Sequence, residues 1–347
     1  RPRVLLYISP DLPVSSSEVG GSKRACQRRR AVRGMAKGSG GRAAFGLIVS
    51  QLPAGARVVA PHDCYGGSMR LLKAREALGQ VSMRFVDQRD DAAVAAALAE
   101  APALLLIETP SNPLLRVVDI ASLAARAKAA GAMVAVDNTF LSPALQRPIA
   151  LGADYVVHST TKYLNGHSDV IGGAVIAADA DGLERIAHWA NVVGCGGSPF
   201  DAWLTLRGLR TLFARMRGQQ SNAMAIAEML SRHPAVAAVH YPGLPGHPDH
   251  ALAARQQSGF GAMLSFELAG GVEAAKRLIG ALGVFTFAES LGGVESLIVH
   301  PATMTHADMG DEARALAGIG PGLLRVSVGL EAEEDLLGDL EAALAAC

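Results

Sequence analysis

An aspartate and a lysine each follow an apolar run in one segment of the chain. Asp137 comes directly after Met133–Val136, and Lys162 lies in a small polar turn that follows Tyr155–Val157. Such runs are typical of strands in a buried sheet, and open α/β sheets bind ligands where their strands end. A lysine beside hydroxyls that can hold a phosphate, with a carboxylate that can pair with a pyridine nitrogen, is the set of groups that a pyridoxal phosphate (PLP) enzyme requires.

Each of the two residues also has an ordinary explanation. A lone lysine after a strand is usually a solvated surface residue, and an aspartate at a strand end is more often a helix N-cap. The lysine, however, stands in the sequence STTKYLNGHSD at 159–169. This segment resembles the lysine signature of the Cys/Met-metabolism family of PLP enzymes, and a motif of eleven residues rarely recurs by chance. The enzyme hypothesis is therefore favoured.

The resemblance extends from about Leu52 to the C-terminus and implies a role for each residue of a cofactor site. Lys162 would bind the PLP aldehyde and, once released by substrate, act as the mobile acid and base. Asp137 would keep the pyridine nitrogen protonated. Four further residues are implied as cofactor contacts: Ser159 and Thr161 at the phosphate, Tyr65 stacked on the ring, and Asn112 near the cofactor hydroxyl. By themselves, a tyrosine in a turn and an asparagine before a proline are more often structural.

Two arginines are candidates for substrate carboxylates, which favour a planar pair of donors. Arg325 is a charge in the middle of the apolar strand Leu323–Val328, where an unpaired guanidinium would be costly. A salt bridge to a nearby glutamate would explain it, but the resemblance assigns it to the α-carboxylate of an amino acid. Arg70 resembles a second arginine that binds a distal carboxylate, and an ordinary exposed helix charge is an equal alternative. Glu289 and Ser290 resemble residues near the substrate entrance that help to choose γ-chemistry.

Within the family, the sequence segments at 60–65, 111–119 and 137–146 resemble those of the bacterial cystathionine γ-synthases. The implied reaction is a γ-replacement of methionine biosynthesis and transsulfuration, in which O-succinylhomoserine and cysteine give cystathionine and succinate. A cystathionine γ-lyase is the alternative, because the lyases share most of these residues. A second alternative is a catalytically weak, oligomeric homologue that holds PLP poorly.

The composition agrees with an enzyme that acts on small amino-acid substrates. The chain has 347 residues, half of them apolar, and 32 basic residues balance 32 acidic ones. No apolar run is long enough to span a bilayer, and zero net charge implies neither a nucleic-acid partner nor a membrane surface. Four scattered cysteines without C-x-x-C spacing indicate reduced thiols in the cytoplasm, with no disulfide frame and no metal site. The resemblance further implies a homotetramer built from dimers.

Apolar runs and Ala-rich repeats in the sequence predict the strands and helices that position these residues. The predicted strands of the first part are Val81–Val86, Ala103–Glu108, Met133–Val136, Tyr155–His158 and Gly172–Ile176. Between them, helices are predicted at Asp91–Ala99 and at Ile120–Ala130, the latter with Asp119 as N-cap and Gly131 after its end. This alternation predicts an α/β fold with a mostly parallel sheet covered by helices, which in the resembled family is PLP fold type I.

A smaller α+β domain is predicted after a change of rhythm near Gly218. Its predicted helices are Asn222–Ser231, Glu273–Leu282 and Ala332–Ala346, and its strands are Val236–His240, Ala262–Leu268 and Leu324–Val328. The chain is thus divided into a PLP-binding domain at 46–220 and a C-terminal domain at 221–347. No glycine-rich nucleotide loop is present in the sequence.

The first 45 residues depart from the family pattern. They carry ten Lys/Arg residues against two Asp/Glu residues and are rich in Gly and Ser. In the family, a tyrosine and an arginine of this region reach the phosphate of the neighbouring subunit, and a Ser-Gly-Met turn adds backbone N–H groups. Here Ser39-Gly40 falls at the spacing of that turn but is followed by Gly41. A nucleic-acid-binding arm and a disordered tail are alternatives, and an out-of-frame coding segment is favoured. We expect residues 1–45 to be mobile or poorly packed, and the start at Arg1 suggests a fragment.

Overall fold

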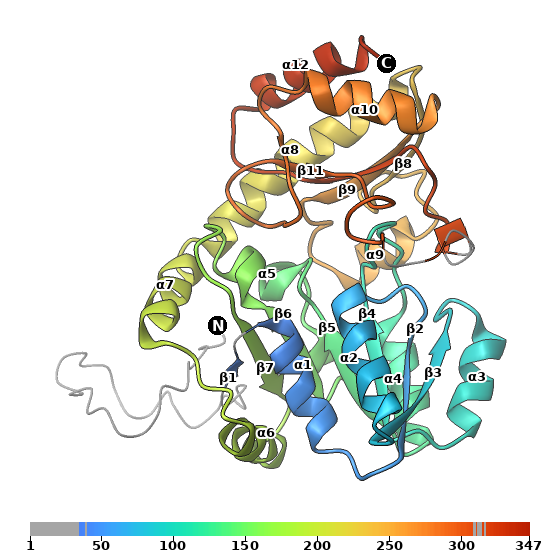
Figure 1. Ribbon diagram of the computed structural model, residues 1–347, viewed down its shortest axis with the longest axis vertical. Helices are drawn as coiled ribbons and strands as arrows, with labels where there is room; N and C mark the ends of the chain where they lie inside the picture. Colours follow the sequence, from blue (N-terminus) through green and yellow to red (C-terminus); the bar gives the residue numbers. More distant parts are fainter. Residues whose placement is uncertain (1–34, 39, 308–309, 311–313, 316) are drawn as a thin grey trace.

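The computed structural model describes residues 35–38, 40–307, 310, 314–315 and 317–347 of the chain. These residues form two sheets with helices packed against them, a larger one in the first part of the chain and a smaller one toward the C-terminus (Figure 1).

The larger sheet has, within the described residues, seven strands in the order β1-β7-β6-β5-β4-β2-β3. The five strands from β6 to β3 are parallel, while β7 runs antiparallel to both β6 and β1. The strands are β1 (Met35–Gly38), β2 (Ala56–Pro61), β3 (Val81–Val86), β4 (Leu104–Glu108), β5 (Met133–Asp137), β6 (Tyr155–Ser159) and β7 (Gly173–Ala177). The predicted α/β fold with a mostly parallel sheet is confirmed.

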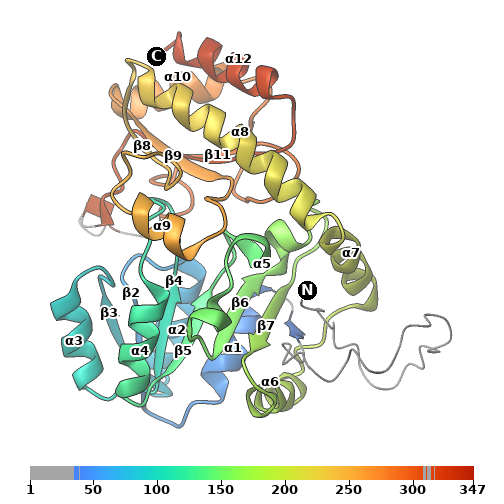
Figure 2. The ribbon, with the colours of Figure 1, turned by 180° about the vertical axis from the view of Figure 1, so that it is seen from behind.

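Helices cover both faces of this sheet, which explains its nearly continuous apolar runs. In β4, Leu104 and Leu106 pack in the core under α1, α2 and α6, whereas Leu105 and Ile107 point to the opposite core under α3 and α4. Figure 1 and Figure 2 show the sheet from its two sides. The helices are α1 (Gly41–Ser50), α2 (Gly66–Ala77), α3 (Asp91–Ala99), α4 (Ile120–Ala129), α5 (Ser142–Leu145) and α6 (Ala180–Val193).

The two helices predicted in this part begin and end as their polar residues indicate. Helix α3 has the predicted bounds, and the carboxylate of Asp90 caps it by accepting from the N–H groups of Ala92 and Ala93. Asp119 caps α4 by accepting from the N–H of Ser122, and Gly131 follows the helix with a φ of 80°, a conformation that favours glycine.

The smaller sheet has the strand order β10-β11-β12-β9-β8 and is antiparallel except for the pair β10–β11. Its strands are β8 (Val236–His240), β9 (Met263–Leu268), β10 (Thr286–Phe287), β11 (Leu297–Val299) and β12 (Leu323–Ser327). Apolar residues of α8 (Leu212–Arg232), α10 (Gly271–Ala281) and α12 (Glu333–Leu344) form one core with this sheet. Two further helices are α7 (Pro199–Leu209) and α9 (His250–Gln256). The strands and helices predicted here are present, with shifts of one or two residues at most ends.

Helix α8 begins ten residues before the predicted helix at Asn222–Ser231. Its first turns bury Arg215 and Gln219 together with Met216. These polar residues on the buried face interrupt the helical repeat of apolar residues from which the start of the helix would be predicted. The predicted domain boundaries at residues 46 and 221 fall inside α1 and α8. The division into two domains near residue 221 remains our proposal.

The expectation that residues 1–45 pack poorly is wrong for the part that the structure describes. Strand β1 pairs with β7, and α1 buries Ala44 and Phe45 against the larger sheet. Both residues belong to one apolar helix face with Leu47 and Ile48, a pattern too short to see in the glycine-rich sequence around it. Residues 1–34 and 39 lie outside the described part.

Candidate active site

A cavity of about 520 Å³ lies at the carboxyl ends of β4, β5 and β6, where residues of the smaller sheet close over it. Nine of the residues predicted for the site line it: Tyr65, Asn112, Asp137, Ser159, Thr161, Lys162, Glu289, Ser290 and Arg325. They come from strand ends and loops that are far apart in the sequence, which the fold brings to one place.

Lys162 lies in a π-helical turn, Thr160–Leu164, that directly follows β6. The side chains of Thr160, Tyr163 and Leu164 are buried and hold the turn in place, while the Lys162 amine reaches into the cavity. Its Nζ donates a hydrogen bond of 2.9 Å to Ser290 Oγ. Burial and the charge of Arg325 lower the pKa of the Lys162 amine to about 8. About a tenth of this amine is therefore neutral, and nucleophilic, at pH 7, far more than of an ordinary lysine.

Asp137 ends β5 with its carboxylate at the cavity. Its Oδ1 accepts bonds from the backbone N–H of Thr139 at 3.0 Å and from the Thr139 hydroxyl at 2.6 Å. Burial raises the pKa of Asp137, and the two bonds from Thr139 act against that rise. Thr139 also accepts from the backbone N–H of Ser159, so it ties the aspartate to the end of the lysine strand. The sequence analysis did not single out Thr139.

Glu108 is a second carboxylate at the cavity that the sequence analysis missed. It ends β4 directly beside Asp137 in the strand register. Burial and the charge of Asp137 raise the pKa of Glu108 well above its ordinary range. Its position at the end of the apolar run Ala103–Glu108, parallel to that of Asp137, was the signal that could have identified it.

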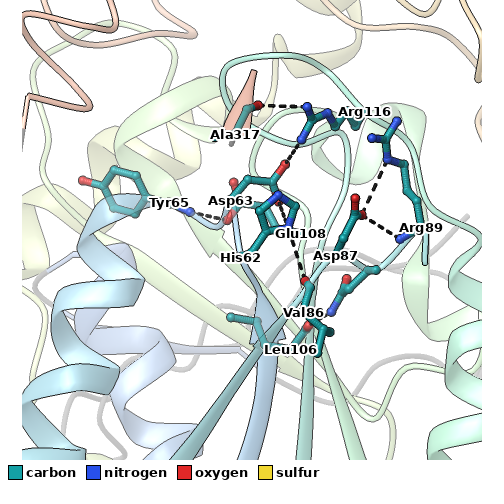
Figure 3. A network of polar contacts seen from close by, with 11 residues as sticks. His62, Asp63, Tyr65, Val86, Asp87, Arg89, Leu106, Glu108, Arg116 and Ala317 are labelled. Carbon is teal, nitrogen blue, oxygen red and sulfur yellow. Dashed lines mark hydrogen bonds and ion pairs between the residues drawn. The ribbon is translucent and has the colours of Figure 1, made fainter. Parts of the chain in front are cut away.

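Glu108 positions the turn that carries Tyr65. The backbone N–H of Tyr65 donates to Glu108 Oε2 at 2.8 Å, and the ring points away from the polar network around it (Figure 3). In that network, Arg116 pairs with Asp63 at 3.3 Å and donates to the carbonyl of Ala317 at 2.8 Å, so residues from three separate segments hold the turn. The Tyr65 ring is 45% exposed and lines the cavity, so it presents an open aromatic face.

Ser159 lies against the first turn of α1, and Thr161 lines the same cavity. A Cβ on Gly41 would lie 3.0 Å from the Ser159 Cβ, so a side chain there would force the two segments slightly apart. The Thr161 hydroxyl is fixed by Gly172, whose N–H it accepts at 3.0 Å and whose carbonyl it donates to at 3.3 Å. The end of β6 and the N–H groups of α1 thus face the same part of the cavity, where an anion is favoured.

Arg325 is the buried cation of the site. It is 3% exposed, with Nη1 donating to Asn112 Oδ1 at 2.8 Å and Nη2 to the carbonyl of Ser290 at 3.1 Å. Burial lowers its pKa to about 10. Among the described residues, no ion pair involves Arg325, and its Nε has no partner. The alternative of a salt bridge to a glutamate is therefore not supported there, and a carboxylate from outside would complete the pairing.

Arg70 is not among the residues that line this cavity within the described part of the chain. It lies on α2 and lines a neighbouring cavity of about 430 Å³ together with Arg42, Arg75 and Cys195. Arg42 lines both cavities and was not singled out by the sequence analysis. The distal-carboxylate role of Arg70 remains a prediction.

The described residues contain neither a metal site nor a membrane-spanning helix. No group of three or more His, Cys, Asp or Glu side chains there could hold a metal ion. None of the helices in this part is both long and apolar enough to cross a membrane.

The sequence model of the Cys/Met metabolism PLP-dependent enzyme family matches residues 22–345 of the chain. The chain belongs to this family. The match begins at residue 22, so it includes part of the N-terminal segment that we expected to depart from the family. The enzyme prediction and the PLP fold type I are confirmed, and the cofactor is pyridoxal phosphate.

Individual relatives include both synthases and lyases. The chain is 59% identical to the cystathionine gamma-synthase of Escherichia coli (strain K12) over 290 residues, which are 84% of this chain and 75% of that protein. It is 46% identical to a cystathionine beta-lyase of Coxiella burnetii over 306 residues, which are 88% of this chain and 79% of that protein. The crystal structure of cystathionine gamma synthase from Xanthomonas oryzae pv. oryzae in complex with aminoacrylate and cysteine has a TM-score of 0.88 at 57% identity, covering 90% of this chain and 81% of that chain.

The side chains of the cavity fit this cofactor. Lys162 offers an amine with a lowered pKa to the aldehyde, Asp137 offers a carboxylate to the pyridine nitrogen, and Tyr65 offers an open aromatic face to the ring. The Ser159 hydroxyl and the start of α1 provide donors for a phosphate, and the Thr161 hydroxyl becomes a donor when it leaves the Gly172 carbonyl.

Proposed function

We propose that the enzyme catalyses a γ-replacement in which O-succinylhomoserine and cysteine give cystathionine and succinate. The observation that carries the proposal is the arginine Arg325, a buried cation with neutral partners, beside the amine of Lys162. A cation in this position favours an amino acid whose α-carboxylate pairs with it and whose α-carbon then lies near the lysine. The 59% identity to a cystathionine gamma-synthase supports the choice of this reaction within the family.

Several side chains of the cavity have a part in this reaction. Arg325 binds the α-carboxylate with its planar pair of N–H groups, which orients the bond that has to break at Cα. When bound, PLP supplies an electron sink for the electron pair that this bond releases. Asp137 would keep the pyridine nitrogen protonated, and the bonds from Thr139 hold its carboxylate in a fixed orientation. Tyr65 would pack on the ring.

Lys162 moves the protons. As a neutral amine it takes the proton from Cα and, after giving this proton up, the proton from Cβ, which frees the electron pair that expels the group on Cγ. After sulfur has bound at Cγ, the ammonium group returns one proton to Cβ and one to Cα. Its bond to Ser290 keeps the amine at the cavity between these steps. The bond from Cγ to the succinyl oxygen breaks, succinate leaves, and the sulfur of cysteine forms the new bond to the same carbon while its thiol proton is released. Glu289, which also lines the cavity, is the carboxylate available to the amino group of the incoming cysteine.

We propose a homotetramer built from dimers and a cytoplasmic location as well. Large apolar side chains are exposed around α7, with Phe200 and Trp203 stacked at a centroid distance of 5.9 Å, and a second copy of the chain would cover such a surface. Within the described part, Cys64, Cys195 and Cys347 are free thiols, as expected in a reducing compartment.

Product analysis tests the proposed reaction. The purified chain is supplied with PLP, O-succinylhomoserine and cysteine, and cystathionine and succinate are quantified, with Lys162→Ala as the inactive control. We expect equal amounts of both products and no reaction with the control. Faster breakdown of added cystathionine than its synthesis would instead indicate a lyase. No turnover in either direction with PLP bound would support the alternative of a catalytically weak homologue.

A further inference from the structure

Arg42 is a cation at the edge of the cofactor cavity that no part of the proposed reaction uses. It is the second residue of α1, and its side chain is exposed. It lines the cavity that holds Lys162 and also the neighbouring cavity, so it lies in the wall between the two. Among the described residues, no hydrogen bond or ion pair engages its guanidinium group.

The stem of Arg42 has a fixed course. A Cβ on Gly67 would lie 2.7 Å from Arg42 Cδ and 2.4 Å from Tyr65 Cε1. The stem and the tyrosine ring therefore share the space that the missing side chain of Gly67 leaves open. Because Tyr65 presents its ring to the cavity, this packing holds the Arg42 stem at the border of the same cavity, which Arg42 lines.

The surroundings of Arg42 favour a strongly charged anion. Helix α1 has ten residues, its N-cap is Gly40, and neither a side-chain cap nor an acidic residue in the first turn satisfies its first N–H groups. Gly41 of this turn lies against Ser159, whose hydroxyl faces the cavity with that of Thr161. The acidic side chains of the cavity, Asp137, Glu108 and Glu289, come from other strand ends and loops and are not paired with Arg42.

We propose that the Arg42 guanidinium is a ligand of the PLP phosphate, supplied by the same subunit that supplies Lys162. A phosphate dianion suits a planar guanidinium, the Ser159 hydroxyl and a free helix N-terminus, because each offers a donor to a separate oxygen. The contact would act in addition to, or in place of, phosphate donors from a neighbouring subunit. The proposal rests on the cofactor of the family and is independent of the γ-replacement reaction.

Cofactor binding measured with and without the phosphate tests this proposal. The cofactor-free chain and its Arg42→Ala, Arg42→Lys and Arg75→Ala variants are titrated with PLP and, separately, with pyridoxal, which lacks the phosphate, and the dissociation constants are obtained from the visible absorbance. We expect Arg42→Ala to weaken PLP binding about tenfold to a hundredfold, since one charge-assisted contact is lost. Pyridoxal binding should change less than about twofold, Arg42→Lys should recover part of the loss, and Arg75→Ala, which lines only the neighbouring cavity, should bind PLP normally.

Three results would overturn the proposal. One is an Arg42→Ala variant that binds PLP as tightly as the unmodified chain. Another is an equal loss for PLP and pyridoxal, since the effect would then not involve the phosphate. The third is unchanged PLP affinity with a KM raised only for O-succinylhomoserine, which would make Arg42 a substrate contact. Thermal unfolding of the cofactor-free variants checks folding, and if the alanine variant does not fold, Arg42→Gln takes its place in the same comparison.

Discussion

Arg325 in β12 and Asn112 after β4 are joined by a hydrogen bond of 2.8 Å from Nη1 to Oδ1, although 213 residues separate them. The bond crosses from the smaller sheet to the larger one, and Lys162 lies beside it at the same cavity. The position of Arg325, the cation proposed to bind the substrate carboxylate, is therefore fixed only when both sheets are in place. This relationship explains why the guanidinium can be buried without an acidic partner in the described part of the chain.

Replacement of Arg325 by lysine should weaken substrate binding although the charge is retained. Lysine cannot offer two parallel N–H donors to a carboxylate, so at least one charge-assisted bond is lost. We expect the KM for O-succinylhomoserine to rise about tenfold to a hundredfold. Steady-state kinetics of Arg325→Lys measure this, with the surface variant Arg126→Lys as a control. A KM within twofold of the unmodified enzyme would show that Arg325 does not bind the substrate carboxylate.

Arg70→Ala tests whether the neighbouring cavity contributes to substrate choice. If Arg70 binds the distal carboxylate, its loss should reduce kcat/KM about tenfold to a hundredfold for O-succinylhomoserine and much less for O-acetylhomoserine, which has no distal anion. Arg75→Ala removes a charge from the same cavity and is the matched control. Equal losses with both substrates would mean that Arg70 does not read the distal carboxylate.

Glu108→Gln should make the stability of the cofactor-free protein less dependent on pH. Burial and Asp137 raise the pKa of Glu108, so the folded protein keeps a proton that the unfolded chain releases above about pH 4.5. The free energy of unfolding therefore falls as pH rises from there until the folded group also ionises. Glutamine retains an acceptor for the Tyr65 N–H but has no proton to lose. Denaturant unfolding at several pH values should give a shallower decrease for the variant, and identical slopes would argue against a raised pKa.

The amine of Lys162 should become reactive at a lower pH than an ordinary lysine. Because burial and Arg325 lower its pKa to about 8, its labelling rate in the cofactor-free chain should rise about tenfold per pH unit below that value and level off above it. Competitive labelling with an amine reagent, followed by peptide mass spectrometry, gives the profile, with exposed Lys73 as the internal comparison. A profile for Lys162 that still rises tenfold per unit at pH 10 would contradict the buried environment.

Most of the fold could be predicted because the apolar residues of its strands and helices recur in clear patterns along the sequence. The parallel strands are buried on both faces and read as apolar runs, and α4 carries its capping aspartate and its terminal glycine in the sequence. Two helices were missed or shortened for different reasons. Helix α8 buries Arg215, which interrupts its apolar face, and the apolar face of α1 is short and follows a glycine-rich stretch.

The candidate site was predicted where motif and strand end coincide. Lys162, Asp137 and Arg325 each stand at or in an apolar run, so their positions at the cavity follow from the strand order. Glu108 also ends an apolar run, but its place beside Asp137 follows only from the sheet order, in which β4 lies beside β5. Arg42 stands in no such run, and its place at the cavity depends on the room that Gly67 leaves for its stem.

Chemical trapping of the cofactor tests the central claim of this account, that Lys162 holds PLP in this cavity. The chain is loaded with PLP and reduced with borohydride, and the modified peptide is identified by mass spectrometry. The account predicts a single pyridoxyl group on Lys162, the lysine with a lowered pKa beside Asp137 and Arg325. Recovery of the pyridoxyl group on another lysine, such as Lys73 or Lys128, would contradict it.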